Sequence, residues 1–178
     1  DGDQPSQKSL LCLASYRPLN KYEWSSSLLL NDGIEDVFIR QVLEPNQEIK
    51  LKAIIPTLDD ITDKVSSMVR DQYEVSPYPR WVNTRLRLKP APISKLVEEI
   101  NLKLFDEKIK EVEAPNILVA GCGTGQQSVA VAASFKNSKV QAIDLSLSSL
   151  SYAKRKTEEL GIQNIDYMQA DILDLGKP

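Results

Sequence analysis

The sequence predicts an α/β fold: a partial parallel sheet of three strands with crossover helices, preceded by a small α-helical domain. Residues 8–70 carry short stretches of helical periodicity separated by turn residues, with no long alternating strand pattern. From Pro115 onward, short apolar runs alternate with helical segments, which is typical of parallel strands joined by helices. A cluster of glycines at residues 121–125 directly follows the first apolar run.

The N-terminal domain is predicted to span residues 1–70, and two of its helices are clearest. The first is Glu35–Leu43, in which Val37, Phe38 and Leu43 form an apolar side. The second is Thr57–Arg70, with Thr57 as its N-cap. Its apolar stripe, which we interpret as core packing, consists of Leu58, Ile61, Val65, Met68 and Val69.

A proline-rich linker is predicted over residues 71–91. Pro77, Pro79 and Pro90 remove backbone donors and favour extended geometry in the residues before them. The last domain then covers residues 92–178 and opens with a helix from Pro92 to Lys110. The domain boundary is therefore expected between residues 71 and 92.

The three predicted strands are Asn116–Ala120, Lys139–Asp144 and Asn164–Met168, and the helices between them are Gln126–Phe135 and Leu147–Leu160. Ser146 is expected to cap the second of these helices, and Gly161 is expected to end it in the left-handed conformation.

Composition narrows the function classes. A net charge of −3 gives no electrostatic reason to expect nucleic acid or an anionic membrane surface as a partner. The chain has two cysteines, far apart, and no histidine, so we expect no metal site of the Cys/His kind and a reduced, cytoplasmic setting. No apolar run approaches the roughly 18–20 residues that cross a bilayer.

The glycine cluster reads Gly121-Cys122-Gly123-Thr124-Gly125. A tight turn from strand to helix needs positive φ values and lets the backbone approach a ligand, and glycine allows both. Cys122 stands where a small side chain fits. A dinucleotide fingerprint, G-x-G-x-x-G, would need its third glycine at position 126, which is Gln126 here.

Two acids follow the next strands. Asp144 ends the second strand, 19 positions after Gly125, where a carboxylate can accept hydrogen bonds from both ribose hydroxyls of an adenosine cofactor. Asp171 lies just past the third strand. Because the carboxyl ends of parallel strands share one edge of the sheet, the glycine turn and both acids are expected to surround one ligand.

The G-x-G-x-G spacing resembles motif I of class I S-adenosylmethionine-dependent methyltransferases, which have a Rossmann-like fold. The runs ILVAGCGTGQ, AIDLS and QADILDL are similar to bacterial methyltransferases that often carry tetratricopeptide repeats, and residues 72–81 (QYEVSPYPRW) are similar to a segment that precedes their catalytic domain. The resemblance implies S-adenosyl-L-methionine as cofactor. It also implies that Asp171 accepts from the adenine amino group, with Ile172 and Leu145 packing on either side of the adenosine.

The predicted cofactor-binding residues are thus Gly121, Cys122, Gly123, Gly125, Asp144, Leu145, Asp171 and Ile172. Neither a catalytic residue nor the methyl acceptor can be assigned. The chain departs from the family at Val119, where many members have an acid that supports the methionine amino group.

Possible additional contacts with cofactor or substrate are Tyr73, Tyr78, Arg80 and Trp81. The alternative is that the aromatics nearest the prolines staple the linker onto the last domain. Four basic residues, Arg80, Arg85, Arg87 and Lys89, form either a patch for an acidic group or a solvated face.

The chain ends before a fourth strand, so we expect the N-terminal half of a larger methyltransferase, inactive alone. We also expect the apolar edge of the strand Asn116–Ala120 to pair with another chain or to be covered by the N-terminal helices. Two other functions remain open: a nicotinamide-dependent oxidoreductase, and a noncatalytic interaction module on a Rossmann scaffold.

Overall fold

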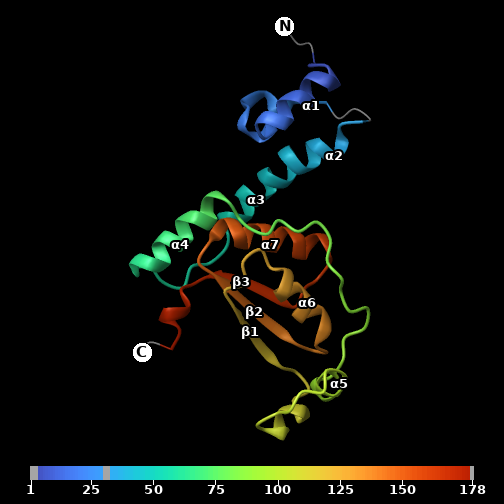
Figure 1. Cartoon of the computed structure of the whole chain (residues 1–178), viewed down its shortest axis with the longest axis vertical. Coiled ribbons are helices and arrows are strands. Elements are labelled where there is room, and N and C mark those ends of the chain that lie inside the picture. The colour runs from blue at the N-terminus through green and yellow to red at the C-terminus, as the bar shows by residue number, and fades with distance from the viewer. Residues whose placement is uncertain (1–3, 30–32, 177–178) are drawn as a thin grey trace. The chain divides into compact units, whose positions relative to one another are not determined.

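The computed structural model describes residues 4–29 and 33–176 (Figure 1). The chain divides into two compact units, Asp1–Ala53 and Ile54–Pro178. Among the described residues, no helix combines the length and the apolar character that crossing a membrane requires.

The first unit is helical. Its helices are α1 (Gln7–Tyr16), α2 (Glu35–Phe38) and α3 (Glu44–Lys52), with short 3₁₀ turns at Leu19–Lys21 and Glu23–Ser27. The predicted helix 35–43 is present, but its second half is π-helical and continues into α3. The core of this unit consists of Leu10, Leu19, Leu28, Ile34, Phe38 and Val42.

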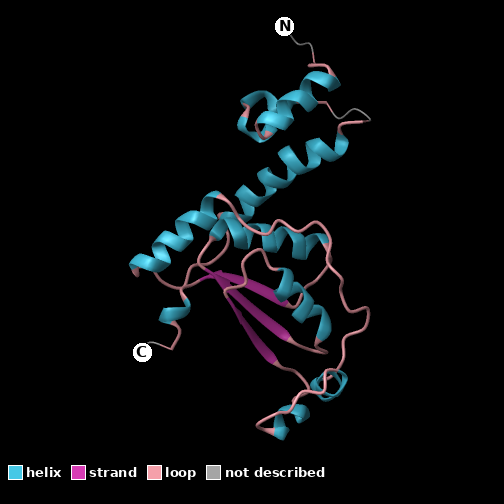
Figure 2. Cartoon of the chain, in the orientation of Figure 1, coloured by secondary structure: helices cyan, strands magenta, loops and turns pink. Residues whose placement is uncertain are grey.

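The second unit contains the predicted α/β fold. Its strands β1 (Asn116–Ala120), β2 (Lys139–Asp144) and β3 (Ile165–Gln169) are parallel, in the order β1-β2-β3 (Figure 2). The bounds of the first two strands are as predicted, and the third is shifted by one residue. Val119 stands opposite Ala142, which stands opposite Tyr167, so these three side chains share one face of the sheet.

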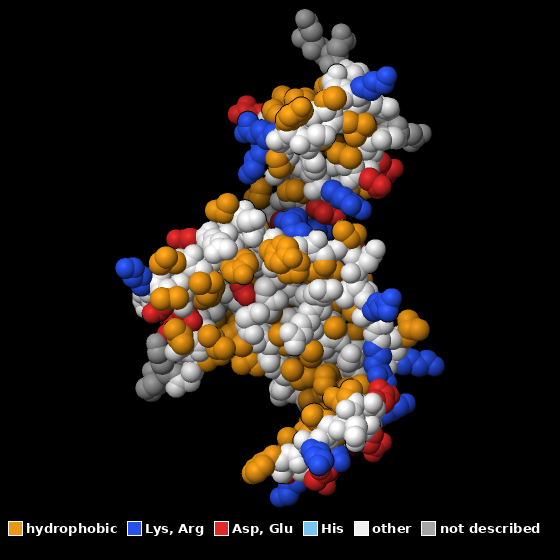
Figure 3. Space-filling view, in the orientation of Figure 1, with side chains coloured by type: hydrophobic (Ala, Val, Ile, Leu, Met, Phe, Trp, Pro, Cys, Tyr) orange, Lys and Arg blue, Asp and Glu red, His pale blue; other side chains and the backbone are white. Residues whose placement is uncertain are grey.

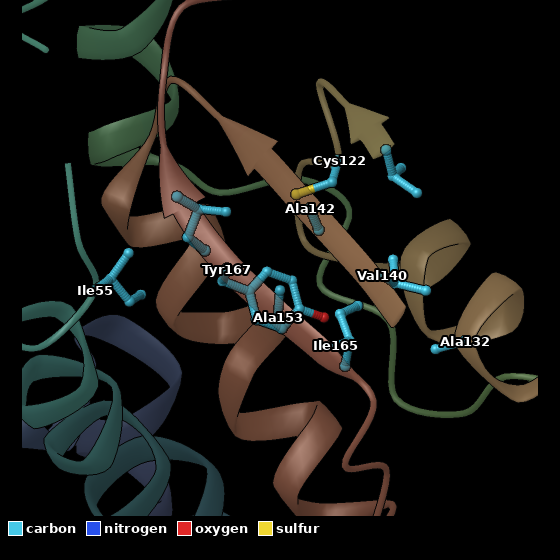
Figure 4. Packing of buried hydrophobic residues seen from close by; sticks show 10 residues of the cluster. Ile55, Cys122, Ala132, Val140, Ala142, Ala153, Ile165 and Tyr167 are labelled. Carbon is cyan, nitrogen blue, oxygen red and sulfur yellow. The ribbon is translucent and has the colours of Figure 1, made fainter. Parts of the chain in front are cut away.

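Helices α6 (Gln126–Ser134) and α7 (Leu147–Glu159) cover that face, as right-handed crossovers require. Ser146 caps α7 through its hydroxyl, which accepts from the Ser149 N–H, and Gly161 follows the helix with φ 69°. Figure 4 shows the resulting core, in which Ala132 of α6 and Ala153 of α7 meet Val140, Ala142, Ile165 and Tyr167 of the strands.

The predicted helix 57–70 is corrected to α4 (Lys64–Val75). Thr57 cannot cap it because residues 56–58 run alongside β3: Gln169 N donates to Pro56 O at 2.8 Å and Leu58 N donates to Gln169 O at 2.9 Å. The cap is Asp63, whose carboxylate accepts from the N–H groups of Val65 and Ser66.

The core interpretation of the α4 stripe is wrong as well. Val65 and Met68 are 68% and 64% exposed, and the region of α4 carries visible apolar side chains in Figure 3. The buried residue of the helix is instead Ser66. Glu74, in the last turn, accepts a hydrogen bond from Ser148 N of α7. Helical spacing identified an apolar stripe on α4 but could not determine which side of the helix faces the sheet.

The division between the units comes before α4, whereas the boundary was expected after it. Two sets of contacts account for the difference. Residues 56–58 extend the sheet beyond β3, and α4 lies against α7, where Ser148 donates to Glu74 (Figure 1).

The predicted helix 92–110 is shorter and interrupted. It forms α5 (Ile93–Glu99) and a separate 3₁₀ turn, Glu107–Glu111. Asn101 has φ 51°, and Leu102 N donates to Val97 O, so the chain leaves the helix there. Just before α5, Ala91 N donates to Ser134 O and Ala91 O accepts from Lys136 N. These two bonds attach the linker to the end of α6.

Candidate ligand-binding site

The glycine turn connects β1 to α6. Gly121, Gly123 and Gly125 have φ values of 67°, 53° and 82°, in the left-handed region that side chains disfavour. A Cβ at Gly125 would lie 2.5 Å from the Cβ of Ala153, so this glycine also lets the turn pack on α7. At Gly121 and Gly123 a Cβ would meet nothing within 4 Å, so both backbones border open space.

Asp144 ends β2 directly beside this turn. Its Oδ2 accepts from Gly123 N at 2.7 Å and its Oδ1 accepts from Ser146 N at 3.0 Å. A carboxylate has roughly four acceptor positions, so acceptor capacity remains for a ligand. The turn therefore orients Asp144 before any ligand arrives.

A cavity of about 390 Å³ opens at the turn. It is lined by Tyr73, Tyr78, Pro79, Gly121, Cys122, Gly123, Thr124, Gln126, Gln127, Asp144 and Ser149. Four of the predicted cofactor residues, Gly121, Cys122, Gly123 and Asp144, thus meet at one cavity. So do Tyr73 and Tyr78, two of the possible additional contacts.

The sequence did not indicate five of the lining residues as site residues: Pro79, Thr124, Gln126, Gln127 and Ser149. Ser149 is buried, and its Oγ has no hydrogen-bond partner among the described residues. Its position in the first turn of α7, just after Asp144, was the only signal for it in the sequence. Gln126 and Gln127 open α6, whose N-cap Gly125 provides no side-chain cap.

The other predicted residues do not line this cavity. Gly125 packs against α7, and Leu145 is half-buried, with its carbonyl accepting from Gln169 Nε2 at 2.7 Å. Ile172 is exposed. Asp171 is buried just past β3, where its Oδ1 accepts from Leu173 N and its Oδ2 has no hydrogen-bond partner among the described residues.

Asp171 nevertheless lies at the same edge of the sheet as Asp144. The preceding residue, Ala170, donates its N–H to the Asp144 carbonyl at 3.1 Å. The glycine turn and the two acids therefore lie at the carboxyl ends of three neighbouring strands. Asp171 does not line the cavity, so their meeting around one ligand stays a prediction.

The remaining candidates, Arg80 and Trp81, contact other parts of the unit. Trp81 is buried against Val129 and Tyr152, and Arg80 lies over the Tyr152 ring at 4.4 Å. For Trp81 this is the packing arrangement that the sequence left as the alternative. In the basic patch, Arg87 donates two hydrogen bonds to Glu99, at 2.6 and 2.8 Å. This contact lowers the pKa of the Glu99 carboxyl.

Two further side chains belong to the packing around the turn. Burial, with the nearby Asp144 charge, raises the pKa of the Cys122 thiol to about 12. The thiol therefore stays protonated at neutral pH and is a poor nucleophile. Val119 is buried in the core and cannot bind an amino group.

Residues 117–178 match the protein family described as "Methyltransferase domain". The chain is 31% identical over 75 residues to probable (S)-tetrahydroprotoberberine N-methyltransferase 2 of Papaver bracteatum, covering 42% of this chain and 21% of that protein. It is 32% identical over 81 residues to release factor glutamine methyltransferase of Rhodopirellula baltica, covering 43% and 27%.

Among solved structures, an S-adenosylmethionine-dependent methyltransferase from Clostridium acetobutylicum is 28% identical, with a TM-score of 0.35, and the match covers 48% of this chain and 29% of that one. The chain spans only 21% and 27% of the two curated relatives above. The family match and the two curated relatives show that this chain is similar to methyltransferases.

Proposed function

We propose that this chain supplies the cofactor-binding part of an S-adenosylmethionine-dependent methyltransferase. The observation that carries the proposal is the Asp144 carboxylate, oriented by Gly123 N–H and Ser146 N–H at the edge of a cavity. The methyltransferase family match covers the same residues. No described residue identifies the methyl acceptor.

Asp144 would bind the ribose. Its remaining acceptor positions suit two neighbouring hydroxyls, which are donors, while the open space at Gly121 and Gly123 lets the cofactor approach the backbone. Gly125 takes no direct part and keeps the turn close to α7.

Asp171 would bind the adenine. A buried carboxylate oxygen without a partner costs about 1–3 kcal/mol or more, and an adenine amino group is a donor that would remove this cost. The neighbouring side chains of Ile172 and Leu145 provide apolar surface for the ring. This assignment rests on the resemblance together with the unpaired Oδ2.

The residues present fit this chemistry. The bound cofactor supplies an already activated methyl group, so the protein has to orient donor and acceptor and exclude water. A dedicated acid–base pair is not required. The residues that line the cavity accordingly offer glycine backbone, one carboxylate, hydroxyls, amides, a thiol, a proline ring and aromatic rings.

Isothermal titration of the chain with S-adenosylhomocysteine tests the proposal. We expect saturable binding that falls at least about tenfold in Asp144→Ala, because the ribose loses a charge-assisted acceptor. Asp166→Ala is the matched control, since Asp166 is an exposed carboxylate on β3 away from the cavity, and its binding should equal that of the unsubstituted chain. Equal affinity in Asp144→Ala would contradict the proposal.

The same titration separates the two alternatives. Tighter binding of NAD than of S-adenosylhomocysteine would favour the nicotinamide-dependent oxidoreductase. If neither binds, and Asp144→Ala leaves the biological role of the full protein unchanged, a noncatalytic interaction module becomes the better account.

A further inference from the structure

One wall of the cavity comes from outside the region that matches the methyltransferase family. Residues 73–82, which we call the strap, comprise the last turn of α4 and the extended segment after it. The strap contributes Tyr73, Tyr78 and Pro79 to the cavity lining, although the family match begins only at residue 117.

Thr124 connects the strap to the glycine turn. Its Oγ1 donates to Pro79 O at 2.6 Å, and its own carbonyl accepts from Trp81 Nε1 at 2.9 Å. Thr124 is buried and stands between Gly123 and Gly125. Its side chain and its carbonyl are therefore both bonded to the strap, which is held against the residues that orient Asp144.

Both ends of the strap are held on α7. At one end, Glu74 accepts from Ser148 N and Ser148 Oγ at 3.0 and 2.9 Å. At the other, Lys156 Nζ donates to Val82 O at 3.0 Å, and Tyr152 OH donates to Trp81 O. These contacts make the middle of the strap an ordered part of the cavity.

Two of the three large aromatics of the strap, Trp81 and Tyr78, differ in their surroundings. Trp81 is 7% exposed and packs on Val129 and Tyr152, so it acts as an anchor. Tyr78 is 75% exposed, yet it lines the cavity on an anchored backbone. An aromatic ring held beside a cavity offers apolar area and a hydroxyl to a ligand at little conformational cost.

We propose that the strap is a fixed wall of the cofactor site, that Tyr78 and Tyr73 contact the bound cofactor, and that Thr124 is the positioning residue that sets the strap. This inference rests on the proposed function. It implies that the cofactor-binding unit requires residues some forty positions upstream of the family match.

Tyr78→Ala tests the contact. We expect S-adenosylhomocysteine to bind about three- to tenfold more weakly, the range of one aromatic contact, with an unchanged unfolding midpoint because the side chain is exposed. Tyr16→Ala is the matched control, an exposed tyrosine in the other unit. Hydrogen exchange gives an independent measurement: saturating ligand should protect the backbone N–H groups of Ser76, Tyr78 and Arg80.

The outcomes separate the two proposals. If the unsubstituted chain does not bind S-adenosylhomocysteine, the proposed function fails. If it binds, and either Tyr78→Ala binds equally well or the strap amides gain no protection, the strap inference is overturned while the proposed function stands.

Thr124→Val tests the positioning role, because it keeps the shape and removes the donor to Pro79 O. We expect affinity to fall about tenfold, with rescue in Thr124→Ser, which restores the hydroxyl. Trp81 emission, read in a Trp24→Phe background, should shift to longer wavelength in the valine variant only. Wild-type affinity in Thr124→Val, or no rescue by serine, would overturn the role assigned to Thr124.

Discussion

Three polar side chains, those of Asp144, Ser149 and Asp171, are the main candidates for contacts with a ligand. Asp144 uses both carboxylate oxygens to accept from neighbouring N–H groups, whereas Ser149 Oγ and Asp171 Oδ2 are buried with no partner among the described residues. Buried polar atoms normally have partners, so unpaired ones beside a cavity or strand edge indicate groups that a ligand can bind.

For Ser149→Ala we expect opposite effects on binding and stability. Affinity for S-adenosylhomocysteine should fall about three- to tenfold if the hydroxyl contacts the ligand, while stability stays equal or rises slightly because a buried unpaired group is removed. Ser151→Ala is the control, because Ser151 is also buried on α7 but already donates to Ser148 O. Calorimetry and urea unfolding on both variants decide the matter; unchanged affinity in Ser149→Ala would exclude the contact.

The Cys122 thiol should make stability depend on alkaline pH. Its pKa rises from 9.0 to about 12 on folding, so the unfolded chain loses this proton before the folded chain does. The contribution of the protonated Cys122 thiol to folding stability is therefore complete below pH 9 and is lost as pH rises through about 12. Between pH 7.5 and 10.5 the unsubstituted chain should lose about 2 kcal/mol more than Cys122→Ala in urea unfolding. Parallel losses in both proteins would refute this.

At the scale of elements, the glycine turn is both a ligand surface and a packing joint. Gly125 faces α7, whereas Gly121 and Gly123 face open space. Gly125 therefore forms the packing side of the turn, and Gly121 and Gly123 form its ligand side.

Gly125→Ala should destabilise the chain by about 3 kcal/mol, because a Cβ would both strain φ +82° and clash with Ala153. Gly161→Ala has a similar φ, +69°, with no atom within 4 Å, so it should cost only about 1 kcal/mol. Thermal and urea unfolding of the pair separate packing from backbone strain. Equal losses would mean that the close approach to α7 contributes nothing.

The outer edge of β1 is a candidate surface for self-association. Among the described residues β1 pairs only with β2, and Leu118 is 53% exposed. We propose self-association through this edge, since unpaired strand groups beside an apolar side chain favour pairing with another chain. Sedimentation should show a larger species at high protein concentration that Leu118→Lys abolishes and Leu88→Lys, at an exposed linker site, does not. A monomer at every concentration would count against it.

At the scale of the whole molecule, the sheet-bearing unit extends further upstream than the family match. Residues 56–58 pair with β3, α4 packs on α7, and the strap lines the cavity. The N-terminal helical unit has its own core, and the described residues that line the cavity belong to the second unit.

Two truncated chains should therefore differ. A chain of residues 54–178 should fold and bind S-adenosylhomocysteine with the affinity of the full chain, because it keeps the strap and the pairing at β3. A chain of residues 92–178, starting at the last domain predicted from sequence, should bind at least about tenfold more weakly or fail to fold. Circular dichroism and calorimetry measure both, and equal affinities would show that the upstream segment is dispensable.

The sequence by itself determined the local features: the glycine spacing, the strands up to Asp144, the Ser146 cap and the three elements gathered at one sheet edge. These depend on side-chain chemistry within a few residues, which a single sequence contains. Only the tertiary structure decided that Thr57 pairs with Gln169, that the α4 stripe faces outward and that Thr124 holds the strap. Those outcomes depend on hydrogen bonds and packing between segments far apart in the chain, for which local periodicity contains no signal.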